Sequence, residues 1–122
     1  MALTEQAQDE KPVEGFWLVQ FSGIRGMGWG TVTLVGGKIF GGDSGFLYTG
    51  SYQQQKDELT ASVHVAAIFP GAQNVMGLEE FDLTLTSQTG EGLVEEGFIE
   101  AAGSIPGTSL SFQAVLRKQS SL

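Results

Sequence analysis

Apolar and polar side chains alternate with a period of two along most of the chain after its first 13 residues. Between Leu59 and Phe69 every second residue is apolar, with polar residues such as His64 between them. Successive side chains of a strand point to opposite faces, so this pattern predicts a strand with one apolar face. Residues 81–85 and 110–116 repeat it, and helical periodicity is nearly absent. We expect eight strands, at residues 14–21, 28–35, 38–41, 45–53, 58–69, 80–88, 92–102 and 108–117.

Eight short strands with one apolar face and no helix to cover it are expected to close on themselves, because closure buries that face and removes unpaired edges. The connections are short, and Gly36-Gly37 is a strong hairpin signal. The sequence therefore predicts an all-β fold, an eight-stranded antiparallel up-and-down barrel. We expect a single barrel domain over residues 14–118. Residues 1–13 are expected to be a disordered N-terminal tail, because they are polar and aperiodic, and residues 119–122 a C-terminal tail.

The interior of such a barrel holds either packed side chains or one small ligand. Small residues, namely Ala61, Ala67 and Ala114, interrupt the predicted inward stripe and favour a cavity, with tight packing as the alternative. A fatty acid or a similar small apolar molecule is the expected ligand. The side chains expected to line the cavity are Phe16, Leu18, Val63, Val65, Phe69, Phe81, Leu83, Leu110 and Phe112.

Charge narrows the possible partners. The formal net charge is −8, which repels phosphate and argues against direct nucleic-acid binding. Nine carboxylates lie between residues 57 and 100, and no Lys or Arg occurs between Lys56 and Arg117. This acidic half is either a solvated surface or a docking surface for a basic protein. The candidate partner-binding residues are Asp57, Glu58, Glu79, Glu80 and Asp82.

The chain contains no cysteine, which excludes thiolate metal sites and disulfides and fits a reducing compartment. The N-terminus lacks the basic and apolar segments of a secretory signal, and no apolar run approaches the ~20 residues of a spanning helix. We therefore expect a soluble, cytoplasmic protein. The single histidine, His64, cannot assemble a zinc site alone, so neither a metal site nor a cofactor is predicted.

The sequence Gly42-Asp43-Ser44-Gly45 resembles the nucleophile loop of a chymotrypsin-like protease. A chain of 122 residues has no room for two packed barrels, and His64 is expected on the polar face of its strand. We favour a turn in which Gly41 and Gly42 take positive φ angles and Asp43 bonds to the backbone. No catalytic residue is predicted.

Two resemblances add to this interpretation. Gly15-Phe16-Trp17 resembles the G-x-W motif of lipocalins, in which an arginine of the last strand stacks on the tryptophan; this implies a lipocalin-like, calycin-type barrel with Arg117 on Trp17. The segments GFWLVQF, GWGTVTLVGGKIFGGDSGFLYTGSY and VHV are similar to the GrlR family of small repressors of type III secretion regulons. The similarity covers residues 14 to about 90.

The GrlR resemblance implies a barrel with an apolar cavity, dimer formation, and repression by binding a helix-turn-helix activator. The family's alternating acids before the strand with VHV are reduced here to Asp57 and Glu58, next to Lys56. Three hypotheses follow: a non-enzymatic negative regulator that binds a transcriptional activator, a carrier or sensor of a small apolar ligand, and an enzyme. The first leads, and the third has the least support.

Overall fold

The computed structural model describes residues 13–24, 26–55, 58–72, 77–87 and 97–122, and none of them lies in a helix. Accordingly, no helix in this part of the chain is long and apolar enough to cross a membrane. The strands are β1 (Gly15–Gly23), β2 (Gly26–Val35), β3 (Lys38–Gly42), β4 (Phe46–Gln55), β5 (Glu58–Ala67), β6 (Glu80–Ser87), β7 (Phe98–Ser104) and β8 (Ser111–Ser120).

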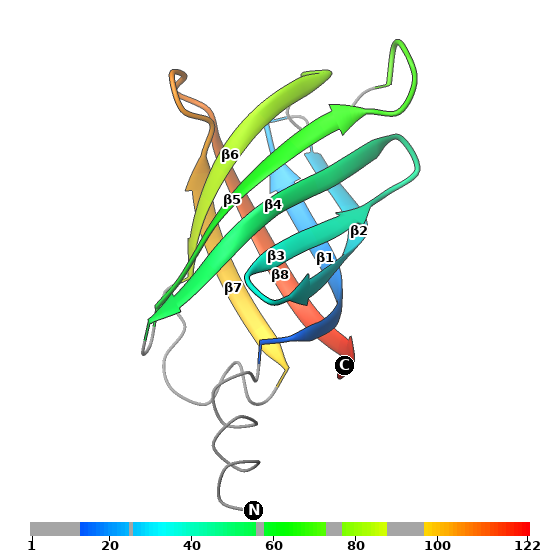
Figure 1. Cartoon of the computed structure of the whole chain (residues 1–122). Helices are drawn as coiled ribbons and strands as arrows, with labels where there is room; N and C mark the ends of the chain where they lie inside the picture. Colours follow the sequence, from blue (N-terminus) through cyan, green and yellow to red (C-terminus); the bar gives the residue numbers. More distant parts are fainter. Residues whose placement is uncertain (1–12, 25, 56–57, 73–76, 88–96) are drawn as a thin grey trace, which may run out of the picture.

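The strands form a closed barrel in which each is antiparallel to its neighbours in sequence and β8 pairs back with β1 (Figure 1). This confirms the predicted all-β, eight-stranded up-and-down barrel, which is consistent with a lipocalin-like architecture. In Figure 1 the upper end carries residues 43–45, 68–72, 77–79 and 105–110, which lie between strands, and the C-terminus lies at the lower end.

Every strand differs from its predicted bounds at one end or both, and the differences that matter most lie in β5, β7 and β8. β5 ends at Ala67 and not at residue 69. β8 begins at Ser111 and not at residue 108, because residues 105–110 form a turn in which the Thr108 N–H donates to the Ile105 carbonyl oxygen. β8 then continues to Ser120 along β1, so residues 119 and 120 of the predicted tail belong to the barrel, and residues 121–122 follow it. β7 begins at Phe98; the predicted strand entry at 92–96 lies outside the described residues.

Trp17 is fully buried at the lower end of the barrel, where β1 pairs with β8. Its Nε1–H donates to the Val13 carbonyl oxygen at 2.9 Å, so Val13 belongs to the folded domain and not to the tail. Residues 1–12 of the predicted tail lie outside the described residues. The Lys118 ammonium lies 5.8 Å from the Trp17 ring, whereas Arg117 lies over Phe98. The expected Arg117–Trp17 contact is wrong, because the β1–β8 register places Lys118 opposite Trp17.

Candidate ligand-binding cavity

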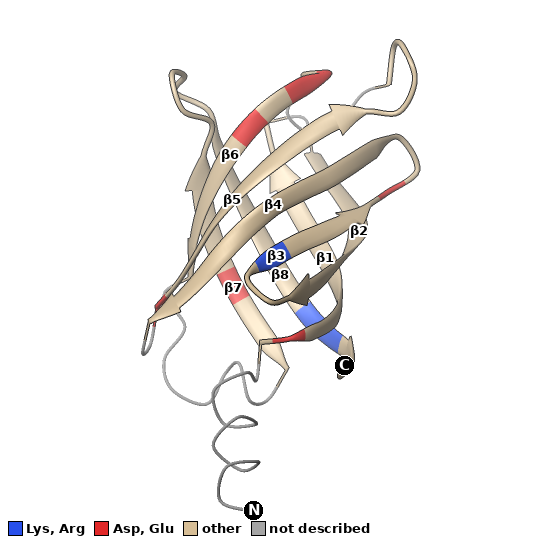
Figure 2. Ribbon diagram, in the orientation of Figure 1, with Lys and Arg blue, Asp and Glu red and all other residues tan. Residues whose placement is uncertain are grey.

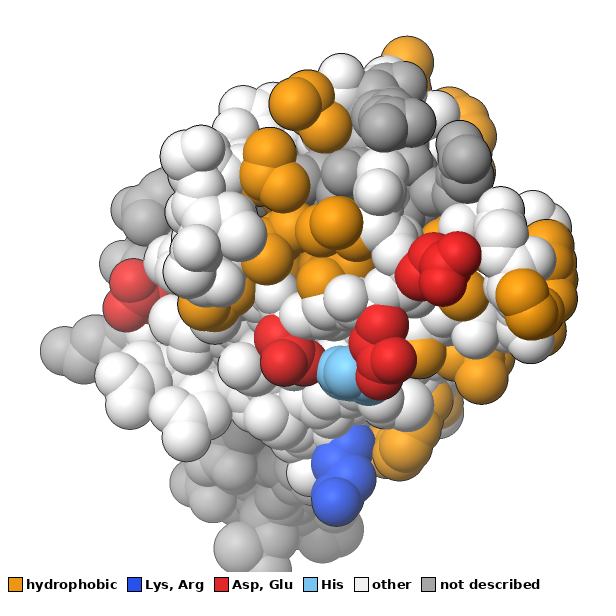
Figure 3. All heavy atoms as spheres, turned by 90° about the horizontal axis from the view of Figure 1, so that it is seen from above, with side chains coloured by type: hydrophobic (Ala, Val, Ile, Leu, Met, Phe, Trp, Pro, Cys, Tyr) orange, Lys and Arg blue, Asp and Glu red, His pale blue; other side chains and the backbone are white. Residues whose placement is uncertain are grey.

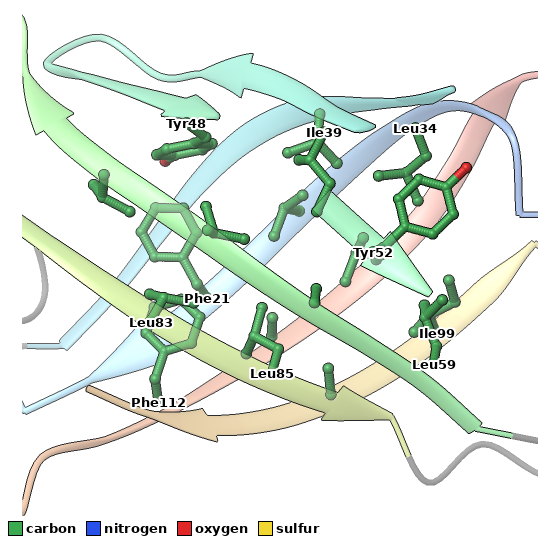
Figure 4. Close-up of a pocket in the computed structure, with 18 of the residues that line it drawn as sticks. Phe21, Leu34, Ile39, Tyr48, Tyr52, Leu59, Leu83, Leu85, Ile99 and Phe112 are labelled. Atoms are coloured by element: carbon green, nitrogen blue, oxygen red, sulfur yellow. The ribbon is translucent and has the colours of Figure 1, made fainter. Parts of the chain in front are cut away.

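The barrel encloses a cavity of about 110 Å³ whose wall is almost entirely apolar (Figure 4). All eight strands contribute to it, because each presents alternate side chains to the interior. The described lining residues are Val19, Phe21, Val32, Leu34, Ile39, Asp43, Phe46, Tyr48, Tyr52, Leu59, Ala61, Val63, Val65, Phe81, Leu83, Leu85, Ile99, Ala101, Phe112, Ala114 and Leu116.

The burial of the inward side chains varies around the wall. Inward residues of β1 to β3, such as Val19, Leu34 and Ile39, are buried. On β5 to β8 burial is mixed: Leu59, Val63 and Leu116 are only partly buried although they face the interior, whereas Val65, Phe81, Leu83, Ile99 and Ala114 are buried. Alanines such as Ala61 and Ala101 lie on these strands and leave space that larger side chains would fill. Part of the open space therefore lies beside these partly buried residues of β5 to β8.

The seam between β6 and β7 is incomplete at the upper end. The two strands pair only over Thr84–Ser87 and Ala101–Ser104, so residues 80–83 of β6 are paired with β5 alone. Phe81 and Leu83 face the cavity from this stretch, which has no partner on β7. Figure 3 views this end and shows hydrophobic side chains in its middle, partly ringed by polar ones.

Asp43 and Tyr48 form a polar pair at the upper end of the cavity wall. The Tyr48 hydroxyl donates to Asp43 Oδ2, and Asp43 Oδ1 accepts the backbone N–H groups of Gly45 and Phe46, both at 2.9 Å. Burial, followed by the hydrogen bond to Asp43, raises the pKa of the Tyr48 hydroxyl above its usual range. The phenol therefore stays protonated and keeps its proton directed at Asp43.

Local sequence explains this arrangement. Asp43 follows β3 directly, its N–H donates to the Phe46 carbonyl oxygen, and its side chain bonds back to the backbone, as aspartates do in tight turns. The predicted turn around Asp43 and Ser44 is thus confirmed. The predicted positive φ angles at Gly41 and Gly42 are wrong, because both glycines lie within β3.

Tyr52 lies at the opposite end of the cavity from Tyr48, among Leu34, Leu59 and Ile99 (Figure 4). Burial raises the pKa of its phenol as well. The cavity thus has a carboxylate and a phenol at one end and a single phenol at the other, with apolar side chains between.

Sequence reasoning identified part of this wall. Val63, Val65, Phe81, Leu83 and Phe112 line the cavity as predicted.

The other four predicted lining residues lie elsewhere, and each has a physical reason. Phe16 and Leu18 point away from the cavity, because Trp17 and Val19 take the inward positions of β1 and Phe16 is 41% exposed. Phe69 lies beyond the end of β5 and is 50% exposed. Leu110 precedes β8 and packs at the edge of the core.

The polar residues of the wall were missed. Phe46, Tyr48 and Tyr52 occupy alternate positions of β4, so the period-two pattern could have placed both tyrosines inside. Asp43 gave no such signal, since its contact with Tyr48 depends on how the turn folds back.

The candidate partner-binding residues do not form one surface. Glu80 and Asp82 point outward from the upper part of β6 and flank His64, and Glu79 precedes them (Figures 2 and 3). Glu58 begins β5 at the lower end, eight residues of strand away from the position opposite Glu80, or about 26 Å at ~3.3 Å per residue. Asp57 lies outside the described residues.

His64 links two of these carboxylates. Its Nδ1 lies 2.7 Å from Asp82 Oδ1 and its Nε2 lies 2.8 Å from Glu80 Oε2. The hydrogen bonds to Asp82 and then Glu80 raise the pKa of His64. Within the described residues, no group of histidine, aspartate and glutamate side chains is arranged to hold a metal ion.

Comparisons with known proteins add no identity to this geometry. The chain matches no model of a known protein family, and a search of curated proteins gives no significant match.

Proposed function

We propose that this protein is a non-enzymatic binding protein that holds a small apolar ligand inside its barrel. The observation that carries the proposal is the apolar cavity of about 110 Å³, beside which several inward side chains of β5 to β8, such as Leu59, Val63 and Leu116, are only partly buried. Unfilled apolar space costs stability, and a ligand that occupies it is bound by the contacts that the wall otherwise lacks.

The cavity volume indicates the size of the ligand. An apolar cavity of about 150 Å³ is known to stay dry and to bind benzene, and drug-sized ligands need about 300 Å³ or more. At about 110 Å³, this cavity fits a molecule of about one ring, or a short alkyl chain, better than a long fatty acid.

Toluene is a suitable test ligand. Saturable binding should stabilise the protein against heat, by about 2.7 kcal/mol at a free concentration of 100 times the Kd. The variant Ala61→Leu, which fills the cavity, should weaken binding at least tenfold. Ser62→Leu adds the same side chain to the exposed outer face of β5 and is the matched control. If toluene does not stabilise the wild type, or if both variants bind it equally, the cavity is not a binding site.

A second proposal concerns regulation through a protein partner. Like GrlR-family repressors, which the sequence resembles, the protein would act in the cytoplasm as a negative regulator that covers a basic helix-turn-helix activator. The acidic group at the upper end, Glu79, Glu80 and Asp82, supports this proposal, because a local negative field steers a basic partner.

Charge reversal at one end only tests the regulatory proposal. Glu80→Lys and Asp82→Lys should slow association with a captured basic activator at low salt and reduce its salt dependence. Glu58→Lys, at the other end of the barrel, makes the same charge change and should have little effect. Equal effects of all three substitutions would mean that net charge alone steers the partner.

Association should also weaken as the pH falls through the raised pKa of His64, since protonation there adds a positive charge between the two carboxylates. His64→Gln removes this titration and should flatten the pH dependence. An unchanged pH profile in His64→Gln would assign the dependence to other groups.

The dimer implied by the family resemblance forms part of the regulatory proposal. Its support is the outer face of β1 to β4, which exposes Phe16, Trp29, Phe40 and Leu47. Large exposed apolar patches commonly mark protein contacts. Trp29→Glu should shift a dimer to monomer in sedimentation experiments, whereas a monomeric wild type would contradict this state.

A further inference from the structure

Asp43 sets the chemistry of the cavity. Among the described lining residues it is the one charged side chain, and no lysine, arginine or histidine faces the interior. The other polar side-chain groups of this described lining are the hydroxyls of Tyr48 and Tyr52, and Tyr52 lies at the opposite end (Figure 4). An anionic head group would therefore meet no cation in this wall.

The hydrogen bonds at Asp43 leave acceptors and no donor. A carboxylate offers about four acceptor positions. Asp43 Oδ1 accepts two backbone N–H groups, and Oδ2 accepts the Tyr48 hydroxyl, which leaves one position on Oδ2. The Tyr48 proton is committed to Asp43, so the phenol oxygen presents only its lone pairs to the cavity. Both groups can accept a hydrogen bond from a ligand.

Electrostatics act in the same direction. A ligand carboxylate beside Asp43 would bring two negative charges together in a partly buried site, where charge repulsion exceeds that in bulk water. A hydroxyl carries no charge and can donate to the free acceptors. Hydrogen bonds to charged groups are stronger than those between neutral groups.

We infer that the cavity selects a small apolar molecule ending in a hydroxyl group, which donates to Asp43 Oδ2 or to the Tyr48 oxygen, and that it rejects carboxylates of the same size. This inference rests on the proposed ligand-binding function and narrows it to one chemical class. The proposed ligand is therefore an alcohol and not the fatty acid expected from the sequence.

The test compares toluene, benzyl alcohol and benzoate, which share a ring and differ in one end group. By calorimetry at neutral pH, wild-type protein should bind benzyl alcohol at least about tenfold more tightly than benzoate, since hydrogen bonds to charged groups are worth this much. Asp43→Asn removes the charge and keeps an oxygen for the two backbone donors, so the affinity for benzyl alcohol relative to benzoate should fall in this variant. Ser44→Ala, on the exposed bend beside Asp43 and outside the cavity lining, should leave this affinity ratio unchanged.

The possible results separate this inference from the function on which it rests. Binding of toluene with equal affinity for alcohol and benzoate would overturn the inference and leave the cavity function standing. A ratio that is unchanged in Asp43→Asn would also overturn it. Failure of all three molecules to bind would overturn both. Thermal unfolding of each variant without ligand shows whether a change in the affinity ratio reflects a loss of folding. Tyr48→Phe keeps the charge of Asp43, so this variant should still bind benzoate more weakly than benzyl alcohol.

Discussion

Two glycine pairs adjoin or end the short strand β3, and the barrel needs them for different reasons. Gly36 and Gly37 precede β3 in a two-residue hairpin and take φ angles of 58° and 83°. Gly41 and Gly42 end β3 with ordinary strand geometry. A Cβ atom built on Gly41 would lie 2.0 Å from the Thr31 carbonyl oxygen, whereas one on Gly36 would meet nothing within 4 Å.

The comparison separates local from long-range reasons for a glycine. The hairpin glycines satisfy a backbone conformation that side chains disfavour, which a sequence pattern can identify. Gly41 satisfies a close approach between β2 and β3 that exists only in the folded barrel. This close approach brings Asp43 to the place where it meets Tyr48 and the cavity.

The largest effect is expected from Gly41→Ala. Its methyl group would collide with the backbone of Thr31 and lie 2.7 Å from Val32 Cα, and backbone atoms cannot rotate away as a side chain does. We expect a loss of about 3 kcal/mol in the free energy of unfolding, measured by urea denaturation. A loss below about 1 kcal/mol would mean that the strands separate easily there, and the distinction between the pairs would fall.

Asp43→Ala should cost somewhat less, about 2 kcal/mol. It removes the acceptor of two backbone N–H groups and leaves the buried Tyr48 hydroxyl without its partner. Asp43→Asn retains the backbone hydrogen bonds and should recover most of the loss. If alanine and asparagine were equally destabilising, the carboxylate charge and not the turn would account for the stability.

Gly36→Ala is the matched counterpart of Gly41→Ala, since the same methyl group enters open space. Only the left-handed conformation opposes it, which costs about 1 kcal/mol. Asparagine tolerates this conformation better, so Gly36→Asn should cost less than Gly36→Ala. If Gly36→Ala lowered the free energy of unfolding as much as Gly41→Ala, the conformation of the hairpin would matter to stability as much as the close approach of β2 and β3.

The sequence predicted the barrel because closure depends on strand count and on a single apolar face, and both follow from a period-two pattern. It failed at β1, where Phe16, Trp17, Leu18 and Val19 are consecutive apolar residues that allow either phase. The register with β8, which buries Trp17 against Lys118, decides the phase.

The candidate site was less accessible to sequence reasoning. Residues on regular strands, such as Val63 and Leu83, were placed correctly, because alternation carries across the strand. Residues beyond strand ends, such as Phe69, were not, because the pattern does not show where pairing stops. Asp43 required the turn, the strand pairing and the burial of Tyr48 together, and none of these is visible in local composition.

The smallest effect is expected at Ser44, the residue next to Asp43. Ser44 is exposed on the bend between β3 and β4, so Ser44→Ala should change the free energy of unfolding by less than about 0.5 kcal/mol. It should also leave toluene binding intact, since Ser44 is not among the residues that line the cavity. Incubation of the wild type with a serine-directed phosphonate, followed by mass spectrometry, should give no adduct, because both ring nitrogens of His64 face carboxylates on β6. An adduct at Ser44 that is absent from Ser44→Ala would instead identify an activated serine, and the loop would then have a catalytic role in addition to holding Asp43 at the cavity.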